Sequence, residues 1–349
     1  MLDRPPVSTV SLVSLLEAGD DDGLAAELVD LATRNRLPGA VRDELQALPD
    51  ARRSALALRV IERAAATTPP VPVERMLMRI LDGLAPDALS WRAARHLIGA
   101  VSTWVGSRPG ALAVLAAVAE RETGECPPAL LAVMRRTAHE GDKHWPAWYR
   151  APMQPWLDDT HGRLNVGEPW AEAANTETPT VELLTHALAA GGAKPAARWS
   201  QRAKTLMAEL GADDTRALIR RWFGLVPSPR TIMLQTEDRW DPNEVPDAYN
   251  ARALRGLLYI LAVTPSQDDD VPAVGRLAQH AAEKVPGHGP RSQMIAHASV
   301  YALERFSTVA SLRELARLRS LGQPPGIAAA LTAAIGRRAV ALSVDPARL

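Results

Sequence analysis

Apolar residues recur every three or four positions along most of the chain, and this spacing restricts the fold more than any other feature. Leu24, Leu28 and Leu31 form one such stripe, and comparable stripes follow as far as Leu312, Leu315 and Leu318. The pattern predicts amphipathic helices that each bury one face. No segment shows a competing two-residue alternation, so the sequence predicts an all-α fold.

Composition and helix breaks support this prediction. Apolar residues make up 47% of the chain but aromatic residues only 4%, and the excess of Ala and Leu favours helices over strands. Gly and Pro separate the stripes, as at 37–39, 106–110 and 126–128. Helices of about ten to sixteen residues joined by short turns are typical of stacked antiparallel pairs. We therefore expect an α-solenoid of the HEAT or armadillo kind, although no exact sequence repeat is present.

The helical rhythm stops between residues 141 and 178. Four tryptophans alternate there with four helix-breaking prolines. This break predicts an N-terminal helical half at 1–140, a connecting loop at 141–178 and a C-terminal half at 179–349.

Tryptophan is enriched at binding hot spots, so the rings of this loop are candidate anchors for a partner. The competing interpretation is that they fold back and fill the seam between the two halves, because four exposed indoles would promote aggregation. The four residues are Trp145, Trp148, Trp156 and Trp170.

Charge and cysteine content exclude several classes of protein. The 40 basic and 40 acidic side chains cancel, so no overall field gathers nucleic acid or an anionic membrane. The single Cys126 cannot form an intrachain disulfide and is a poor start for a zinc site. Without a signal-like N-terminus or an apolar run of about eighteen residues, the chain is expected in the cytoplasm.

Catalytic motifs are scarce. The chain has no Gly-x-Ser-x-Gly, phosphate-binding loop or dinucleotide fingerprint. His139–His144 contains two imidazoles and two carboxylates, but the spacing matches no i, i+4 ligand pair and Gly141 interrupts it. We therefore predict a non-enzymatic protein with no catalytic residue, metal or cofactor.

The stretch Pro286–Ser292 is the most distinctive local motif. Gly287 and Gly289 permit left-handed backbone angles after a helix, and Pro290 is expected to set the angle of the next one. Arg291 and Ser292 would then lie in its first turn. Two interpretations follow: the turn binds a carboxylate or phosphate, or Arg291 pairs with an acidic group of the neighbouring repeat while Ser292 satisfies a free N–H of the helix.

Several blocks of the C-terminal half resemble the helical region of a bacterial family built around domain of unknown function 4132, which includes MolR-like and WGR-associated proteins. The resemblance covers about residues 180–349 and implies HEAT-type repeats. Larger members continue into the namesake domain, so we expect no activity of that domain here. The blocks that carry the resemblance are 194–200, 207–211, 220–222, 250–257, 285–292 and 301–303.

The expected function is that of a scaffold whose concave surface binds a protein or peptide partner, or of a helper subunit for an enzyme encoded nearby. Besides the tryptophans, Arg255 and Arg291 are the predicted polar contacts. The alternative is a HEAT-like nucleic-acid-binding protein, DNA glycosylase-like or simply DNA-binding, because residues 194–230 hold eight basic and three acidic side chains. Its candidate contacts are Arg198, Arg202, Lys204, Arg220 and Arg221.

Overall fold

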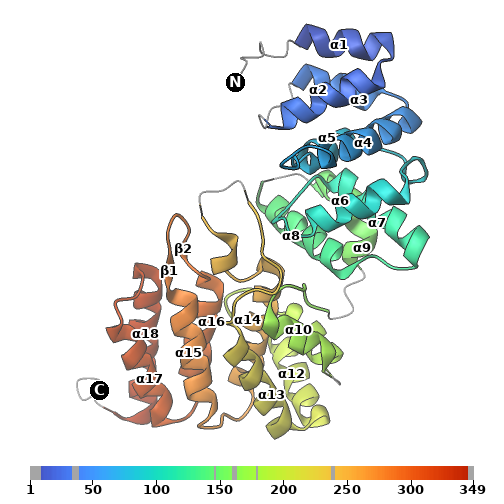
Figure 1. Ribbon diagram of the computed structural model, residues 1–349. Coiled ribbons are helices and arrows are strands. Elements are labelled where there is room, and N and C mark those ends of the chain that lie inside the picture. The colour runs from blue at the N-terminus through green and yellow to red at the C-terminus, as the bar shows by residue number, and fades with distance from the viewer. Residues whose placement is uncertain are drawn as a thin grey trace. The chain divides into compact units, whose positions relative to one another are not determined.

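A computed structural model describes residues 9–33, 39–144, 147–158, 163–177, 180–236 and 240–344, and only the backbone at 9–11 and 140–144. The chain divides into two compact units, unit 1 (Met1–Asp159) and unit 2 (Thr160–Leu349). The described secondary structure is helical apart from one two-residue strand pair, which confirms the all-α prediction (Figure 1).

Unit 1 is built from two rows of helices. In one row α2, α4, α6 and α8 pack in succession, and in the other α1, α3, α5 and α7 do so. Its elements are α1 Thr9–Ala18, α2 Asp21–Thr33, α3 Gly39–Ala47, α4 Asp50–Ala65, α5 Glu74–Ile80, η1 Pro86–Ala88, α6 Trp91–Val101, α7 Pro109–Thr123, α8 Pro128–His144, η2 Ala147–Tyr149, η3 Ala151–Met153 and α9 Gln154–Asp158.

Unit 2 repeats this alternation. The succession α10, α13, α15, α17 forms one row and α11, α14, α16, α18 the other, with α12 against α13 and α14 (Figure 1). Its elements are α10 Pro169–Thr176, α11 Val181–Leu188, α12 Ala197–Leu210, α13 Ala212–Leu225, η4 Pro242–Glu244, α14 Ala248–Val263, α15 Asp270–Ala282, β1 Lys284–Val285, β2 Gly289–Pro290, α16 Gln293–Arg305, α17 Val309–Ser320 and α18 Pro325–Leu342.

Local sequence determines where many helices begin and end. Pro109 opens α7, where its missing N–H costs nothing, and Gly124 ends that helix with φ 86°. Asp247 caps α14 by accepting from the backbone N–H groups of Tyr249 and Asn250. Among the described helices, none combines the length and apolar character needed to cross a bilayer.

Each unit has its own apolar core. The Leu and Ala stripes of the helices supply most of it, as the helical spacing predicts. Unit 2 also contains a very close helix contact at Gly256 of α14. A Cβ atom at Gly256 would lie 2.0 Å from the carbonyl oxygen of Ala187 in α11, so only glycine fits there without a backbone shift.

The segment 141–178 is not a single connecting loop. Its first part forms η2, η3 and α9, and buries Met153 in the core of unit 1. Its last part includes α10 and buries Trp170 in the core of unit 2. The division at residues 159 and 160 therefore falls inside the predicted connector, because apolar side chains on each side of it join different cores.

A buried polar cluster fastens the start of unit 2 to α14. Asn165 donates from its backbone to Asn250 Oδ1 at 2.7 Å and from Nδ2 to Asp247 Oδ1 at 3.0 Å. Glu168 accepts from Asn250 Nδ2 at 2.8 Å and forms an ion pair with Arg230 at 3.2 Å. Burial raises the pKa of Glu168. The contacts of Asn165 with Asp247 and of Glu168 with Asn250 each join residues 82 positions apart in the sequence.

Candidate functional site

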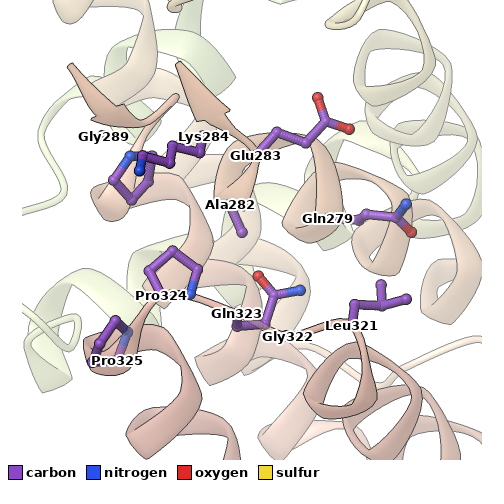
Figure 2. A pocket seen from close by; sticks show the side chains of 11 residues that line it. Gln279, Ala282, Glu283, Lys284, Gly289, Leu321, Gly322, Gln323, Pro324 and Pro325 are labelled. Carbon is purple, nitrogen blue, oxygen red and sulfur yellow. The ribbon is translucent and has the colours of Figure 1, made fainter. Parts of the chain in front are cut away.

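Unit 2 contains an open pocket with a volume of about 660 Å³ (Figure 2). Three short segments line it: the last turn of α15, the β1–β2 hairpin and the turn between α17 and α18. Pro290, Pro324, Pro325 and Leu321 provide apolar surface. Pockets that take small ligands or side chains span about 300–1,000 Å³, so this one is large enough for a ligand.

The hairpin that forms one wall follows from its glycines. Gly287 and Gly289 have φ values of 78° and 103°, which confirms the predicted left-handed angles. The prediction that Pro290 starts the next helix is wrong. Pro290 instead pairs with Lys284 across the hairpin, and α16 begins only at Gln293.

Arg291 and Ser292, the last two residues of the Pro286–Ser292 stretch, both form hydrogen bonds within unit 2. Ser292 caps α16 by accepting from the backbone N–H of Ile295 at 3.3 Å, which confirms the capping interpretation. Arg291 Nε donates to Glu283 Oε2 at 3.1 Å, and its Nη1 donates to the carbonyl oxygen of Glu244. The structure thus shows the predicted pairing of Arg291 with an acidic neighbour.

Two glutamines place polar groups in the pocket. Gln279 Oε1 accepts from Arg317 Nη1 at 3.1 Å, and because Arg only donates, this contact fixes the amide orientation. Gln323 Nε2 donates to the Leu318 carbonyl at 3.1 Å, which fixes that amide in the same way. The Gln279 Nε2 donor and the Gln323 Oε1 acceptor have no hydrogen bond to any described residue.

The unpaired charge at the pocket rim is positive. Lys284 is exposed and forms no ion pair with a described residue. Glu283, by contrast, is engaged by Arg291 and lies 3.5 Å from His280 Nδ1. Burial, with the nearby Arg291, lowers the pKa of His280. In Figure 2 the Glu283 side chain extends away from Pro324 and Pro325, so Lys284 supplies the available charge.

The predicted tryptophan anchors that the structure describes belong to both units and differ in exposure. Trp145 lies outside the described residues. In unit 1, Trp148 is 70% exposed, whereas Trp156 is half-buried and donates to Glu120 Oε1 at 2.6 Å. Trp170 belongs to unit 2, is 1% exposed and donates to Glu168 Oε2 at 3.1 Å. Its ring fills the core of that unit and presents no surface to a partner.

Arg255, the other predicted polar contact, is also engaged within unit 2. It is half-buried on α14 and donates from Nη2 to the carbonyl oxygen of Ala190, just after α11. Burial lowers the pKa of Arg255. Its guanidinium therefore satisfies the end of a neighbouring helix, which is a structural role.

Most of the predicted nucleic-acid contacts are neutralised by acidic partners. Arg202 forms two hydrogen bonds with Glu209, at 2.9 and 3.1 Å. Arg220 pairs with Asp270 at 2.9 Å, and Arg221 pairs with Glu177. Arg198 and Lys204 of α12 are exposed and have no ion pair among the described residues.

Metal and thiol chemistry find no support in the described part of the chain. No group of three His, Cys, Asp or Glu residues there could hold a metal ion. Most side chains of His139–His144, which the sequence does not favour as a metal site, lie outside the described residues. Burial raises the pKa of Cys126 to about 12, so its thiol stays protonated and unreactive at neutral pH.

No family model, curated protein or solved structure matches this chain. The resemblance to the domain of unknown function 4132 family therefore stays a prediction. Sequence reasoning also missed Gln279, Lys284 and Gln323, although the glycines of the hairpin and the pair Pro324–Pro325 mark the turns that form the pocket.

Proposed function

We propose that this chain is a HEAT-like α-solenoid scaffold that binds a segment of a protein partner without chemical conversion. The open pocket of unit 2 carries the proposal. Successive helices packed in two rows expose their connecting turns along an edge, and such edges and faces serve as extended binding surfaces in repeat proteins. Here the turns after α15 and α17 form a pocket instead of closing on each other.

The chemistry of the lining favours binding over reaction. The lining residues include no hydroxyl, thiol or imidazole. The carboxylate of Glu283 already accepts from Arg291, so it is poorly placed to act as a base. A pocket of prolines, leucine and amides provides contact surface and hydrogen bonds, which are the requirements for recognising a peptide.

Site-specific photocrosslinking tests the proposal. A photoreactive p-benzoylphenylalanine at Leu321, which is 46% exposed at the pocket, should crosslink a protein in lysate of the source cells. The same group at Val181, which is 53% exposed but outside the pocket, is the matched control. A nuclease-resistant protein adduct at Leu321 and none at Val181 supports the proposal. Equal labelling at both positions contradicts it.

The identity of the crosslinked molecule also separates the remaining alternatives. An enzyme as the partner would support the helper-subunit interpretation. The nucleic-acid alternative depends on the exposed Arg198 and Lys204, and it predicts binding that falls steeply with salt and is lost when both are replaced by Glu.

A further inference from the structure

We infer that the pocket of unit 2 recognises an extended peptide segment in which a large apolar side chain is followed by a carboxylate. The inference rests on the proposed function and specifies its ligand. Its basis is the combination of two unpaired amide groups, a proline-rich lining and one unpaired cation, all within a single pocket.

The two amides offer the donor and the acceptor that the backbone of an extended chain can bind. Gln279 offers an N–H donor and Gln323 offers a carbonyl acceptor, while the other half of each amide is bound within unit 2. A residue in extended conformation presents its own C=O and N–H on the same side, as a strand does to its neighbour. A helical segment uses these groups internally, so it would leave both glutamines unpaired.

The apolar lining of the pocket favours a large apolar side chain on the bound peptide. Leu321 and the rings of Pro290, Pro324 and Pro325 offer carbon surface that is open to solvent in this structure. Burying this surface against a leucine-sized or larger side chain is favourable, at about 25 cal/mol per Å² of apolar area removed from water. A polar side chain would gain little from it, so the apolar residue provides most of the affinity.

Lys284 favours a carboxylate on the peptide residue that follows the apolar one. It supplies the unpaired charge of the rim, since Glu283 is held by Arg291 and Arg317 is held by Glu314 at 2.7 Å. An acidic side chain beside the apolar residue would be attracted, and a basic one repelled. A single lysine is too little charge for a nucleic-acid strand, whose binding scales with the number of phosphates neutralised.

Three fluorescein-labelled seven-residue peptides with blocked ends test this recognition on the full chain. The reference probe is Ser-Thr-Val-Leu-Asp-Thr-Ser, the second replaces its Asp by Lys, and the third replaces its Leu by Ser. Fluorescence anisotropy at low salt measures the dissociation constants. The reference should bind about fivefold tighter than the Lys probe and about tenfold tighter than the Ser probe.

Reversing the charge at position 284 tests whether Lys284 binds the carboxylate of the peptide. Lys284→Glu should reverse the preference, so that the Lys probe binds more tightly than the reference. Lys194→Glu is the control, because Lys194 is an exposed lysine of unit 2 outside the pocket. An unchanged preference in Lys284→Glu, or an equal change in both variants, overturns the inference.

Methylation of the probe backbone tests the amide contacts. N-methylation at one position of the reference probe should weaken binding to the wild-type chain about tenfold and have no further effect on Gln323→Met. Circular dichroism confirms that each variant remains folded. If no N-methyl position is selective for Gln323, the backbone contact is wrong and the inference fails.

The peptide and crosslinking experiments distinguish a failure of the inferred ligand class from a failure of the proposed function. When no probe binds but Leu321 still crosslinks a protein, the ligand class inferred here is wrong and the proposed function stands. When Leu321 also captures nothing, both are wrong. Binding of the Ser probe as tight as the reference contradicts the apolar anchor, whatever the other variants show.

Discussion

Arg53 of unit 1 and Arg216 of unit 2 are both buried at helix contacts, but they have different partners. In unit 1, Arg53 of α4 donates to the carbonyl oxygens of Ile80 at 3.3 Å and Asp82 at 3.4 Å, and pairs with Asp50 at 2.5 Å. Asp50 has a side chain that is 38% exposed. In unit 2, the buried Arg216 of α13 pairs with Asp270 of α15, which is also fully buried.

This difference shows two ways to seat a charged side chain between helices. Arg53 is held by carbonyl dipoles together with Asp50, and that carboxylate keeps contact with water. Arg216 is held by a charge that has lost its water altogether, and Asp270 also binds Arg220 at 2.9 Å. Removing one member of a buried pair leaves the other uncompensated, so unit 2 should be the more sensitive of the two to single changes.

The largest effect is expected for Asp270→Asn. It leaves Arg216 buried without its directly paired carboxylate, and should lower the free energy of unfolding of unit 2 by about 4 kcal/mol. Hydrogen exchange of α13–α15 in the full chain measures this loss. Asp50→Asn makes the same change in unit 1, where water and the carbonyls remain available to Arg53. Equal loss of protection in the two units would show that the contrast is wrong.

Gly256→Ala should come next. The new methyl group would meet the Ala187 backbone, and the forced shift between α11 and α14 should cost about 3 kcal/mol. Gly110→Ala is the counterpart in unit 1, where the nearest atom is the Asp82 carboxylate, a side chain that can move. Thermal unfolding of both variants checks the order, which fails if Gly110→Ala is the more damaging.

Arg53→Met tests the contribution of the arginine that binds backbone carbonyl oxygens in unit 1. The flexible methionine keeps much of the volume but leaves carbonyl oxygens around α5 without their donor, at a cost of about 2 kcal/mol. Urea denaturation measures the change. A loss of stability about half that of Asp270→Asn would support the contrast between the two arginines. A larger loss in Arg53→Met than in Asp270→Asn would contradict it.

A pH titration should give the smallest effect. Burial lowers the pKa of His186, whose Nε2 donates to the Trp199 carbonyl oxygen at 3.0 Å. The unfolded chain therefore binds this proton more readily. The stability contributed by neutral His186 is complete above its unfolded value near 6.5 and is lost as pH falls through the folded pKa.

Urea unfolding of unit 2 at pH 7.5 and 5.5 should therefore show a modest decline at the lower pH. His186→Asn removes the titrating group, and its decline should be shallower. His280, whose pKa is also lowered, still titrates in that variant and accounts for the remaining slope. An identical slope in the two proteins would rule out His186 as a source.

Local features of the chain were predictable because their causes are local. The stripe spacing determines the helices, and the glycines at 287 and 289 adopt the angles that only glycine reaches easily. Ser292 caps its helix because its oxygen lies three residues from the N–H that it binds. Each of these needs no knowledge of distant residues.

Features that depend on distant partners were not predictable. Several arginines of 194–230 are neutralised by acidic partners that lie outside that segment, including Glu177, Glu182 and Asp270. Trp170 is buried by helices that follow it in the chain. The pocket joins turns about forty residues apart, so no window along the sequence contains Gln279 and Gln323 together.

The buried polar cluster of unit 2 has a consequence for the order in which the chain folds on the ribosome. Asn165 and Glu168 cannot complete their hydrogen bonds until Asn250 has been synthesised, and the polar atoms that still lack a partner must remain hydrated until then. In unit 1 the contact between Asp21 and Arg59 spans only 38 residues. Unit 1 is synthesised first, and its helices contact partners that are close in the sequence. It can therefore finish folding before the start of unit 2 makes its contacts with α14.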